Sequence, residues 1–209
     1  MDGTLLDSER LSEISWDAAA RKFGATVSRE LFLKMVGHRS ADCFRILQSA
    51  FQHRILPEKA LLAAAREHYA RLVAGGVPLM RGAREMFGFA RERGWKIGVA
   101  TSTRRASAQA KLAYHDLWKF VDAATCGDEV ARGKPDPEIF AATVKKLGVP
   151  AAECLAVEDS PTGFRAAFGA GCLAVLVPDL VAPTSDALRD AAGVFPSLVD
   201  LLAFLRGIF

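Results

Sequence analysis

Residues 155–177 read LAVEDSPTGFRAAFGAGCLAVLV, and this stretch decides the fold. It begins with a short apolar run at 155–158 and ends with a second one at 173–177, both of the length of a strand. The residues between them, 161–170, have the pattern of a helix. A strand, a helix and another strand in this order predict a unit whose two strands are parallel.

The same alternation extends upstream of this stretch. From residue 81 the sequence predicts a helix closed by Gly94, a strand at 96–100, a helix at 106–117, a strand at 123–125 and a helix closed by Gly148. Helices that alternate with buried strands indicate a parallel sheet that is covered on both faces. The fold class is therefore α/β.

Residues 9–74 have a different pattern, which is helical throughout. Leu11, Ile14 and Ala18 share one face of a first helix, and Pro57 suits the first turn of a later one. A Gly-Gly pair at 75–76 and a proline at 78 then end the helical region. An all-helical segment thus precedes the alternating one.

Composition excludes several classes of protein. The 209 residues are 51% hydrophobic and 24% charged, with a net charge of +3 whose basic residues are scattered, so neither a nucleic-acid partner nor a membrane surface is indicated. The four cysteines lie far apart without a CxxC pair, and no basic-then-apolar leader precedes the first helix. We expect a reduced, cytoplasmic protein without a membrane span.

Four polar clusters fall where strands of the predicted sheet end. They are residues 2–8, 101–103, 133–137 and 158–160. Each has a plain structural interpretation: Asp, Ser and Thr cap helices, and Lys134 suits a solvated loop. Glu158 and Asp159 are harder to explain in this way, because two adjacent acids after an apolar strand lose hydration unless a cation sits beside them. Since ligands of parallel sheets bind at the carboxyl ends of strands, the four clusters together predict a chemical site.

The four clusters, with their flanking residues, resemble the motifs of a known superfamily. The segments are DGTLLDSE at 2–9, VATS at 99–102, GKPDP at 133–137 and VEDSPTG at 157–163. In this order they resemble motifs one to four of the haloacid dehalogenase superfamily, in particular the branch of phosphoglycolate phosphatases and β-phosphoglucomutases. The resemblance implies a Rossmann-like core at 1–8 and 79–209, with an inserted all-α cap at 9–78.

The resemblance also implies a reaction and the residues that perform it. It implies Mg²⁺-dependent transfer of a phosphoryl group from a small phosphorylated metabolite through a phosphoaspartate, with Asp2 as general acid and base. Lys134 would screen the phosphate, Thr101 would donate its hydroxyl to a phosphoryl oxygen, and the backbone at Gly3, together with Ser102, would bind substrate. The metal site would comprise Glu158, Asp159 and the carbonyl of Asp2.

At its first motif the sequence departs from the family. That motif normally contains a nucleophilic Asp two positions before the acid/base Asp, at the end of a buried strand, whereas here only Met1 precedes Asp2. Two explanations are open: the natural start lies upstream of Met1, or the chain has lost hydrolysis. In either case we expect the first core strand to be missing and the 209-residue polypeptide to be inactive, because the attacking carboxylate is absent.

Substrate and reaction class leave further alternatives. Arg39, in a predicted loop of the cap, suits either a second anionic group of the substrate or solvent. Sugar-phosphate mutases of this branch carry a histidine ten positions after the acid/base Asp, whereas this chain has Ser12 there, which favours a phosphatase. A catalytically silent phosphate- or Mg²⁺-binding relic is a third possibility. A receiver-like module is disfavoured because its acids precede its Thr and Lys. We leave open whether the protein is a monomer or a homodimer.

Overall fold

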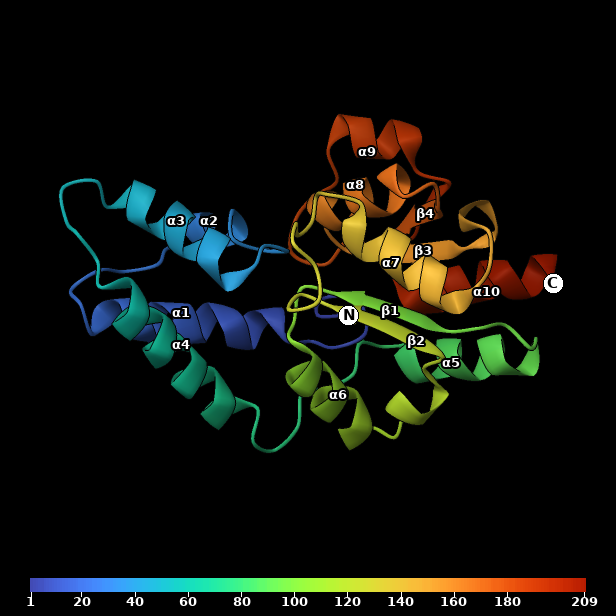
Figure 1. The fold of residues 1–209 in the computed structure, drawn as a ribbon, viewed down its shortest axis with the longest axis horizontal. Coiled ribbons are helices and arrows are strands. Elements are labelled where there is room, and N and C mark those ends of the chain that lie inside the picture. The colour runs from blue at the N-terminus through green and yellow to red at the C-terminus, as the bar shows by residue number, and fades with distance from the viewer.

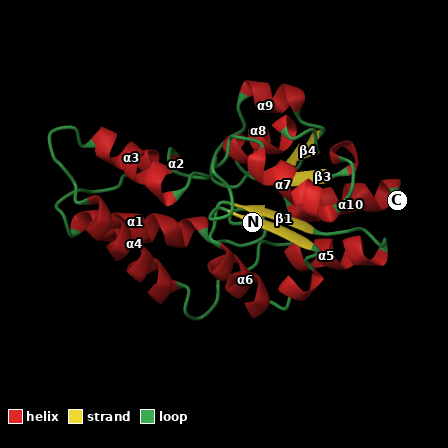
Figure 2. Cartoon of the chain, viewed as in Figure 1, coloured by secondary structure: helices red, strands yellow, loops and turns green.

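The computed structural model describes all residues from 1 to 209. The helical elements on the N-terminal side gather at one end of the molecule, and the strands with their covering helices form the other (Figures 1 and 2). In chain order, the helices and strands are α1 (Glu9–Arg21), α2 (Arg29–Leu33), α3 (Ser40–Ala50), α4 (Glu58–Leu72), α5 (Ala83–Glu92), β1 (Gly98–Thr101), α6 (Arg105–Tyr114), β2 (Ala123–Cys126), α7 (Glu138–Leu147), β3 (Leu155–Glu158), α8 (Pro161–Gly169), β4 (Leu173–Leu176), α9 (Ser185–Asp190), β5 (Gly193–Val194) and α10 (Leu198–Ile208).

Every strand pairing is parallel. β1 pairs with β2 in register Gly98↔Ala123, and β3 pairs with β4 in register Leu155↔Leu173. β5 adds to the far side of β4, so the strands form a two-stranded sheet and a separate three-stranded one. All four residues of β2 are buried, as are the last three of β4, which agrees with strands covered on both faces. The α/β class with parallel strands is confirmed.

Local signals fix the ends of the helices that border the strand ends. Ser160 begins α8, and its hydroxyl oxygen accepts a hydrogen bond from the Gly163 N–H at 3.2 Å. Pro161 occupies the first turn, where its missing N–H costs nothing. Gly148 ends α7 with a φ of +66°, a left-handed conformation that glycine adopts without strain. The start of α8 therefore places Ser160 directly after the carboxyl end of β3, whereas Gly148 directs the chain toward its amino end.

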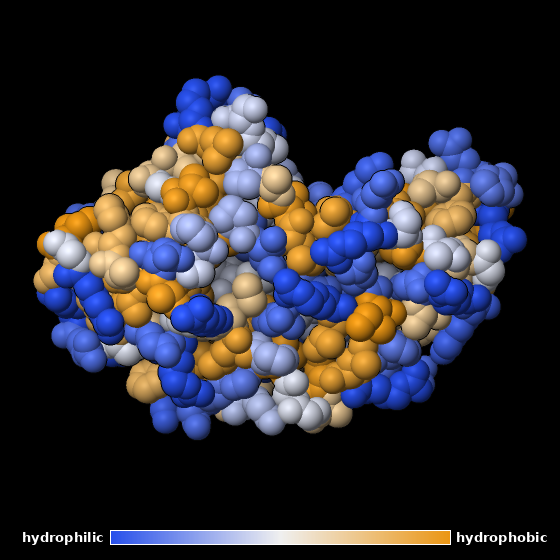
Figure 3. Space-filling model, turned by 180° about the vertical axis from the view of Figure 1, so that it is seen from behind, coloured by the Kyte–Doolittle hydropathy of each residue, from blue (hydrophilic) through white to orange (hydrophobic).

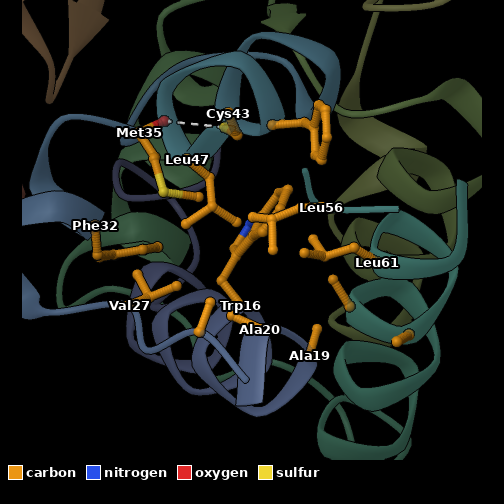
Figure 4. Packing of buried hydrophobic residues seen from close by; sticks show 14 of the residues in the cluster. Trp16, Ala19, Ala20, Val27, Phe32, Met35, Cys43, Leu47, Leu56 and Leu61 are labelled. Carbon is orange, nitrogen blue, oxygen red and sulfur yellow. Dashed lines mark hydrogen bonds between the residues drawn. The ribbon is translucent and has the colours of Figure 1, made fainter. Parts of the chain in front are cut away.

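Helices α1–α4 form a cap with a hydrophobic cluster of its own. Trp16, Leu47 and Leu61 lie at its centre, and Cys43 donates to the Met35 carbonyl oxygen at its edge (Figure 4). Of the three residues expected to share one face of α1, Leu11, Ile14 and Ala18, Ile14 is not buried, since 51% of it is exposed. α1 instead turns its indole ring inward, because burying Trp16 removes more apolar surface from water than burying Ile14.

Two chain crossings join the cap to the rest of the molecule. Leu6 forms a bridge with Leu79, and the Asp7 N–H donates to the Pro78 carbonyl oxygen at 2.9 Å. Seen from behind, the outline of the molecule is hollowed between the cap and the larger group (Figure 3). The domain limits 1–8 with 79–209 and 9–78 stay a prediction. None of the helices combines the length and apolar character that crossing a membrane requires.

The sequence-based element boundaries differ from the structure in several places. The strand expected at 96–100 spans Gly98–Thr101, because the chain reaches β1 only after residues 95–97. α6 ends at Tyr114 rather than 117, because Asp116 takes a positive φ of 59° and turns the chain. Pro57 precedes the first turn of α4 instead of lying within it. Finally, α9, β5 and α10 were not predicted. The buried leucines of α10 share one hydrophobic cluster with Phe89 of α5 and Val175 of β4.

Candidate functional site

The site begins with Asp2, whose carboxylate receives three hydrogen bonds. Ser8 Oγ and Lys111 Nζ donate to Oδ1 at 2.7 and 2.6 Å, and Thr103 Oγ1 donates to Oδ2 at 2.7 Å. Burial opposes ionisation of this carboxyl group, but the Lys111 ammonium outweighs it and holds the pKa of Asp2 well below its usual range. Asp2 is therefore a fixed, ionised carboxylate in this arrangement.

Lys134 and Glu158 form a buried ion pair at the end of β3. Lys134 Nζ lies 2.5 Å from Glu158 Oε1, and both side chains are almost fully covered. The ammonium also lies 5.1 Å from the centre of the Phe140 ring. A buried charge needs such a partner, so each member holds the other in place. Glu158 thus directs a positive charge toward the strand ends.

Unlike Asp2 and Glu158, Asp159 has no lysine partner within ion-pair distance. Thr4 Oγ1 donates to Oδ1 at 2.8 Å, and Oδ2 lies against Gly3, where an added Cβ would approach it to 2.4 Å. Burial and repulsion by Glu158 raise the pKa of Asp159 to about 6. The Gly3 backbone, with a φ of +74°, allows this close approach.

The carboxylates of Glu158 and Asp159 suit a divalent cation, which prefers oxygen ligands. No group of three His, Cys, Asp or Glu side chains converges anywhere in the structure, so a cation here would take one or two carboxylates and complete its shell with carbonyl oxygens, water or substrate. Mg²⁺ is usually bound in this way. The uncompensated charge of Asp159 is the feature that such a cation would relieve.

The residues of the second motif lie at the end of β1. Thr101 is buried, and its hydroxyl oxygen accepts the Thr103 N–H at 3.2 Å. The Ser102 carbonyl lies so near Gly127 that a Cβ there would meet it at 2.1 Å. Because β1 and β2 are in parallel register up to Thr101, their ends place these hydroxyls at one edge.

Arg39 lies where the cap meets the larger group of elements. Its guanidinium packs on Gly133, donates to the Ala131 carbonyl oxygen at 3.5 Å and pairs with Asp42 at 3.6 Å. It therefore bridges α3 and the loop that carries Lys134. Part of the hydrogen-bonding capacity of the Arg39 guanidinium is thus already used by Ala131 and Asp42.

One cavity of about 610 Å³ connects these residues. It is lined from the strand side by the predicted residues Asp2, Thr101, Ser102, Lys134, Glu158 and Asp159, and from the cap by Arg39 together with Ser12, Trp16, Arg66 and Tyr69. A second, shallower hollow of about 730 Å³ runs between α3 and residues 131–136, but it contacts neither Asp2 nor Asp159. The first cavity is accordingly the candidate site. Gly3 does not line this cavity but contacts the Asp159 carboxylate, which does.

Several residues that line the cavity or contact its carboxylates were not predicted from the sequence. They are Thr4, Ser8, Glu9, Thr103 and Lys111. Thr4, Ser8 and Glu9 lie inside the first quoted motif and Thr103 in the second polar cluster, so their position was a usable signal. Lys111 carried none, because it lies in the middle of a helix 109 residues from Asp2. Burial, with repulsion by Asp2 and Asp159, raises the pKa of Glu9 to about 8.

Comparison with known proteins gives consistent matches. Residues 1–171 match the family model described as haloacid dehalogenase-like hydrolase. The phosphorylated carbohydrates phosphatase of Thermotoga maritima is 30% identical over 171 residues, which cover 82% of this chain and 79% of that protein. The plasmid-borne protein CbbY of Cupriavidus necator is 32% identical over 225 aligned positions, covering 96% of this chain and 84% of that protein.

Solved structures agree with these sequence matches. The crystal structure of CbbY from Rhodobacter sphaeroides in complex with phosphate superposes with a TM-score of 0.80 at 27% identity. The match covers 96% of this chain and 93% of that one. The chain is thus similar in sequence and in fold to these proteins over most of its length.

Proposed function

Because the chain belongs to the haloacid dehalogenase-like hydrolases, we propose that it is built to hydrolyse a small phosphomonoester through a phosphoaspartate, with Mg²⁺. The observation that carries the proposal is the convergence of Asp2, Thr101, Lys134 and Asp159 on one cavity from four distant segments. A phosphatase of phosphorylated carbohydrates among the relatives supports the substrate class. A cytoplasmic location belongs to the same proposal.

In this proposal Asp2 moves the proton. It protonates the leaving oxygen of the substrate and then, as a base, takes a proton from the water that cleaves the phosphoaspartate. Its three hydrogen bonds hold the carboxylate in one orientation, which supports such a role because proton transfer needs a fixed distance. The ionised form in this arrangement suits the step in which Asp2 acts as the base. To act as the acid, Asp2 must first gain a proton, which the monoanion of a bound phosphomonoester can supply.

Lys134 and Thr101 stabilise charge on the phosphoryl group. The substrate and its attacking carboxylate are both anionic, so a positive charge must lie beside them before they can approach. Lys134 supplies that charge from a buried position fixed by Glu158, and the Thr101 hydroxyl is available to a phosphoryl oxygen. Gly3 and Ser102 are proposed to bind the same group, and Arg39 to bind a more distant part of the substrate.

Asp159, with Glu158 and the carbonyl oxygen of Asp2, would hold Mg²⁺. When bound, Mg²⁺ withdraws charge from a phosphoryl oxygen and screens the approaching carboxylate. The poorly compensated carboxylate of Asp159 supports this assignment. Glu158 contributes by fixing Lys134 as well, because its Oε1 is already taken by the ammonium.

No carboxylate of the 209 residues is proposed to attack phosphorus. Asp7 pairs with Arg10, and the carboxylate of Asp2 is held by its own three donors. We therefore propose that turnover needs an apolar strand ending in Asp directly before Met1. The unshared edges of β1 and β3 support this, since each of these strands is paired on one side only.

A sugar-phosphate mutase and a silent binding protein are the alternatives. Ser12, which lines the cavity, stands where mutases of this branch carry a histidine, and this favours hydrolysis. The substrate remains a small phosphorylated metabolite in either enzyme. For the silent protein, phosphate and Mg²⁺ would bind without turnover.

The test compares two polypeptides with p-nitrophenyl phosphate and Mg²⁺. The 209-residue chain should not exceed background, whereas the same chain preceded by an apolar strand ending in Asp should turn over substrate. Asp2→Asn in the longer chain should reduce its rate by at least about a hundredfold. Clear Mg²⁺-dependent turnover by the 209-residue chain that Asp2→Asn abolishes would show that the mechanism is wrong. Inactivity of both chains would favour the silent protein.

A further inference from the structure

Lys111 is buried at the boundary between the cap and the larger group of elements. It lies on α6, and only 11% of its side chain is exposed. Its ammonium nitrogen is 2.6 Å from Asp2 Oδ1 and 4.9 Å from the centre of the Tyr69 ring. Asp2 belongs to the N-terminal loop and Tyr69 to α4 of the cap, so a single ammonium contacts both sides of the boundary.

These two contacts depend on each other. Burying an ammonium is unfavourable unless charged or polarisable groups surround it, and here a carboxylate and an aromatic face do so. The ion pair is largely shielded from water, since only 18% of the Asp2 side chain is exposed, and the Tyr69 ring lies on its ammonium side. An ion pair shielded from water is screened less, so the ring strengthens the attraction between Lys111 and Asp2.

The same end of α6 also holds the linker that follows α4. Tyr114 donates its hydroxyl to the Gly75 carbonyl oxygen at 2.8 Å, and a ring nitrogen of His115 lies 2.6 Å from the Val77 carbonyl oxygen. Lys111, Tyr114 and His115 are spaced by three and four residues, so they share one face of the helix. One face of α6 therefore meets the last cap helix and the chain that leaves it.

We propose that Lys111 is a positioning residue that couples the seating of the cap to the orientation of the Asp2 carboxylate. The inference rests on the proposed function for the task given to Asp2. When the cap moves away, Tyr69 leaves the ammonium, water reaches the ion pair, and the carboxylate is held less firmly. By reciprocity, the ion pair favours the seated cap.

The coupling is tested by the distance between cap and core. Spin labels attached through p-acetylphenylalanine at positions 55 and 188 spare the four cysteines and stand on side chains that are 93% and 52% exposed. Lys111→Met and Tyr69→Leu should each shift the distance distribution toward longer values. Tyr69→Phe, which keeps the aromatic face but loses the hydroxyl, should shift it less than Tyr69→Leu, and Lys111→Arg, which keeps the charge, should leave it nearly unchanged.

A matched control and a double variant sharpen the result. Lys119 places its ammonium 5.3 Å over the Phe120 ring within the core, so Lys119→Met removes a similar contact without touching the cap and should not move the distance. Lys111→Met combined with Tyr69→Leu should shift the distance no further than either change alone, because both remove the same contact. Unchanged distances in Lys111→Met, or additive shifts in the double variant, would overturn the coupling.

Kinetics provide the second readout, in the longer chain with the added strand and Asp. Lys111→Met should lower kcat by a factor on the order of ten to a hundred while KM changes little, and Lys111→Arg should recover part of the loss. An equal loss in both variants, or an effect on KM alone, would remove Lys111 from the positioning of Asp2. If the longer chain has no activity, the proposed function fails, and the distances still decide whether Lys111 couples cap and core.

Discussion

At the scale of single residues, the site is a balance of buried charges. Lys134 cancels Glu158 and Lys111 cancels Asp2, whereas Asp159 has only the hydroxyl of Thr4 as a donor. A carboxylate left in this state resists ionisation, and its pKa of about 6 reflects that. The remaining negative charge is the property that would attract the proposed cation to this position.

Replacing Asp159 tests this charge balance directly. Asp159→Asn keeps the size of the side chain but removes the charge, so the dissociation constant of Mg²⁺ should rise by a factor on the order of ten or more. Titration calorimetry with Mg²⁺ measures the change. Asp7→Asn, in the N-terminal loop and paired with Arg10, should leave the affinity nearly unchanged. Equal affinity in the wild type and in Asp159→Asn would exclude Asp159 from the metal site.

The motifs predicted the residues at this scale, but not their partners. Asp2, Lys134 and Asp159 stand in short segments whose composition is unusual after an apolar strand. Lys111 stands in an ordinary helical pattern, and only the folded chain brings it to Asp2. A contact across about a hundred residues depends on the packing of α6, which no local pattern encodes.

At the scale of elements, helix α8 lies very close to the acids it follows. A Cβ added at Gly163 would lie 1.9 Å from Glu158 Oε2, and Glu158 cannot turn aside without leaving Lys134. Gly163 has an ordinary helical backbone, so its conformation does not require a glycine. The requirement comes from packing, because any side chain there would collide with Glu158. The helix and the ion pair are consequently one structural unit.

Replacing Gly163 by alanine should destabilise the protein, although alanine has the higher helix propensity. Gly163→Ala should lower the free energy of unfolding by about 1–3 kcal/mol, because crowding of Glu158 outweighs the gain from alanine. Gly169→Ala, at the other end of α8, meets only Pro137 at 3.5 Å and should be neutral or slightly stabilising. Urea unfolding measures both variants. Stabilisation by Gly163→Ala would mean that Glu158 moves freely.

Strands and long helices were predictable because their signals are local. The apolar run at β4 is continuous since three of its four residues are buried, β3 alternates half-buried and buried residues, and Gly148 ends α7 as expected. The buried face of α1 was not predictable, because the choice between Ile14 and Trp16 depends on what the other cap helices offer. β5 has two residues and is too short to produce a pattern.

At the scale of the whole molecule, Glu9 stands at the junction where the cap begins. It is the first residue of α1 and lines the cavity together with Asp2 and Asp159. Burial and these two carboxylates raise its pKa to about 8 from its usual value of 4.5. Between these two pH values the folded protein holds a proton that the unfolded chain has lost. Stability therefore decreases as pH rises through this window.

The thermal midpoint measured without divalent cations tests this dependence. Between pH 5 and pH 8, Glu9 should cost at least about 1 kcal/mol, which corresponds to a decrease of roughly 2–4 °C in Tm. Glu9→Gln should remove that part of the decrease, because an amide does not titrate. Glu13→Gln, on the same helix but paired with Arg29, should keep it. Parallel pH profiles for the wild type and Glu9→Gln would refute this role.

The separate hydrophobic cluster of the cap has an evolutionary consequence. Its central side chains, Trp16, Leu47 and Leu61, hold α1–α4 together, and of these three only Trp16 also lines the cavity. Changes on the cavity side of the cap, at positions such as Ser12 and Arg66, therefore leave both this cluster and the acids of the core intact. After gene duplication, one copy can drift toward a new metabolite while inheriting the ancestral phosphate chemistry unchanged.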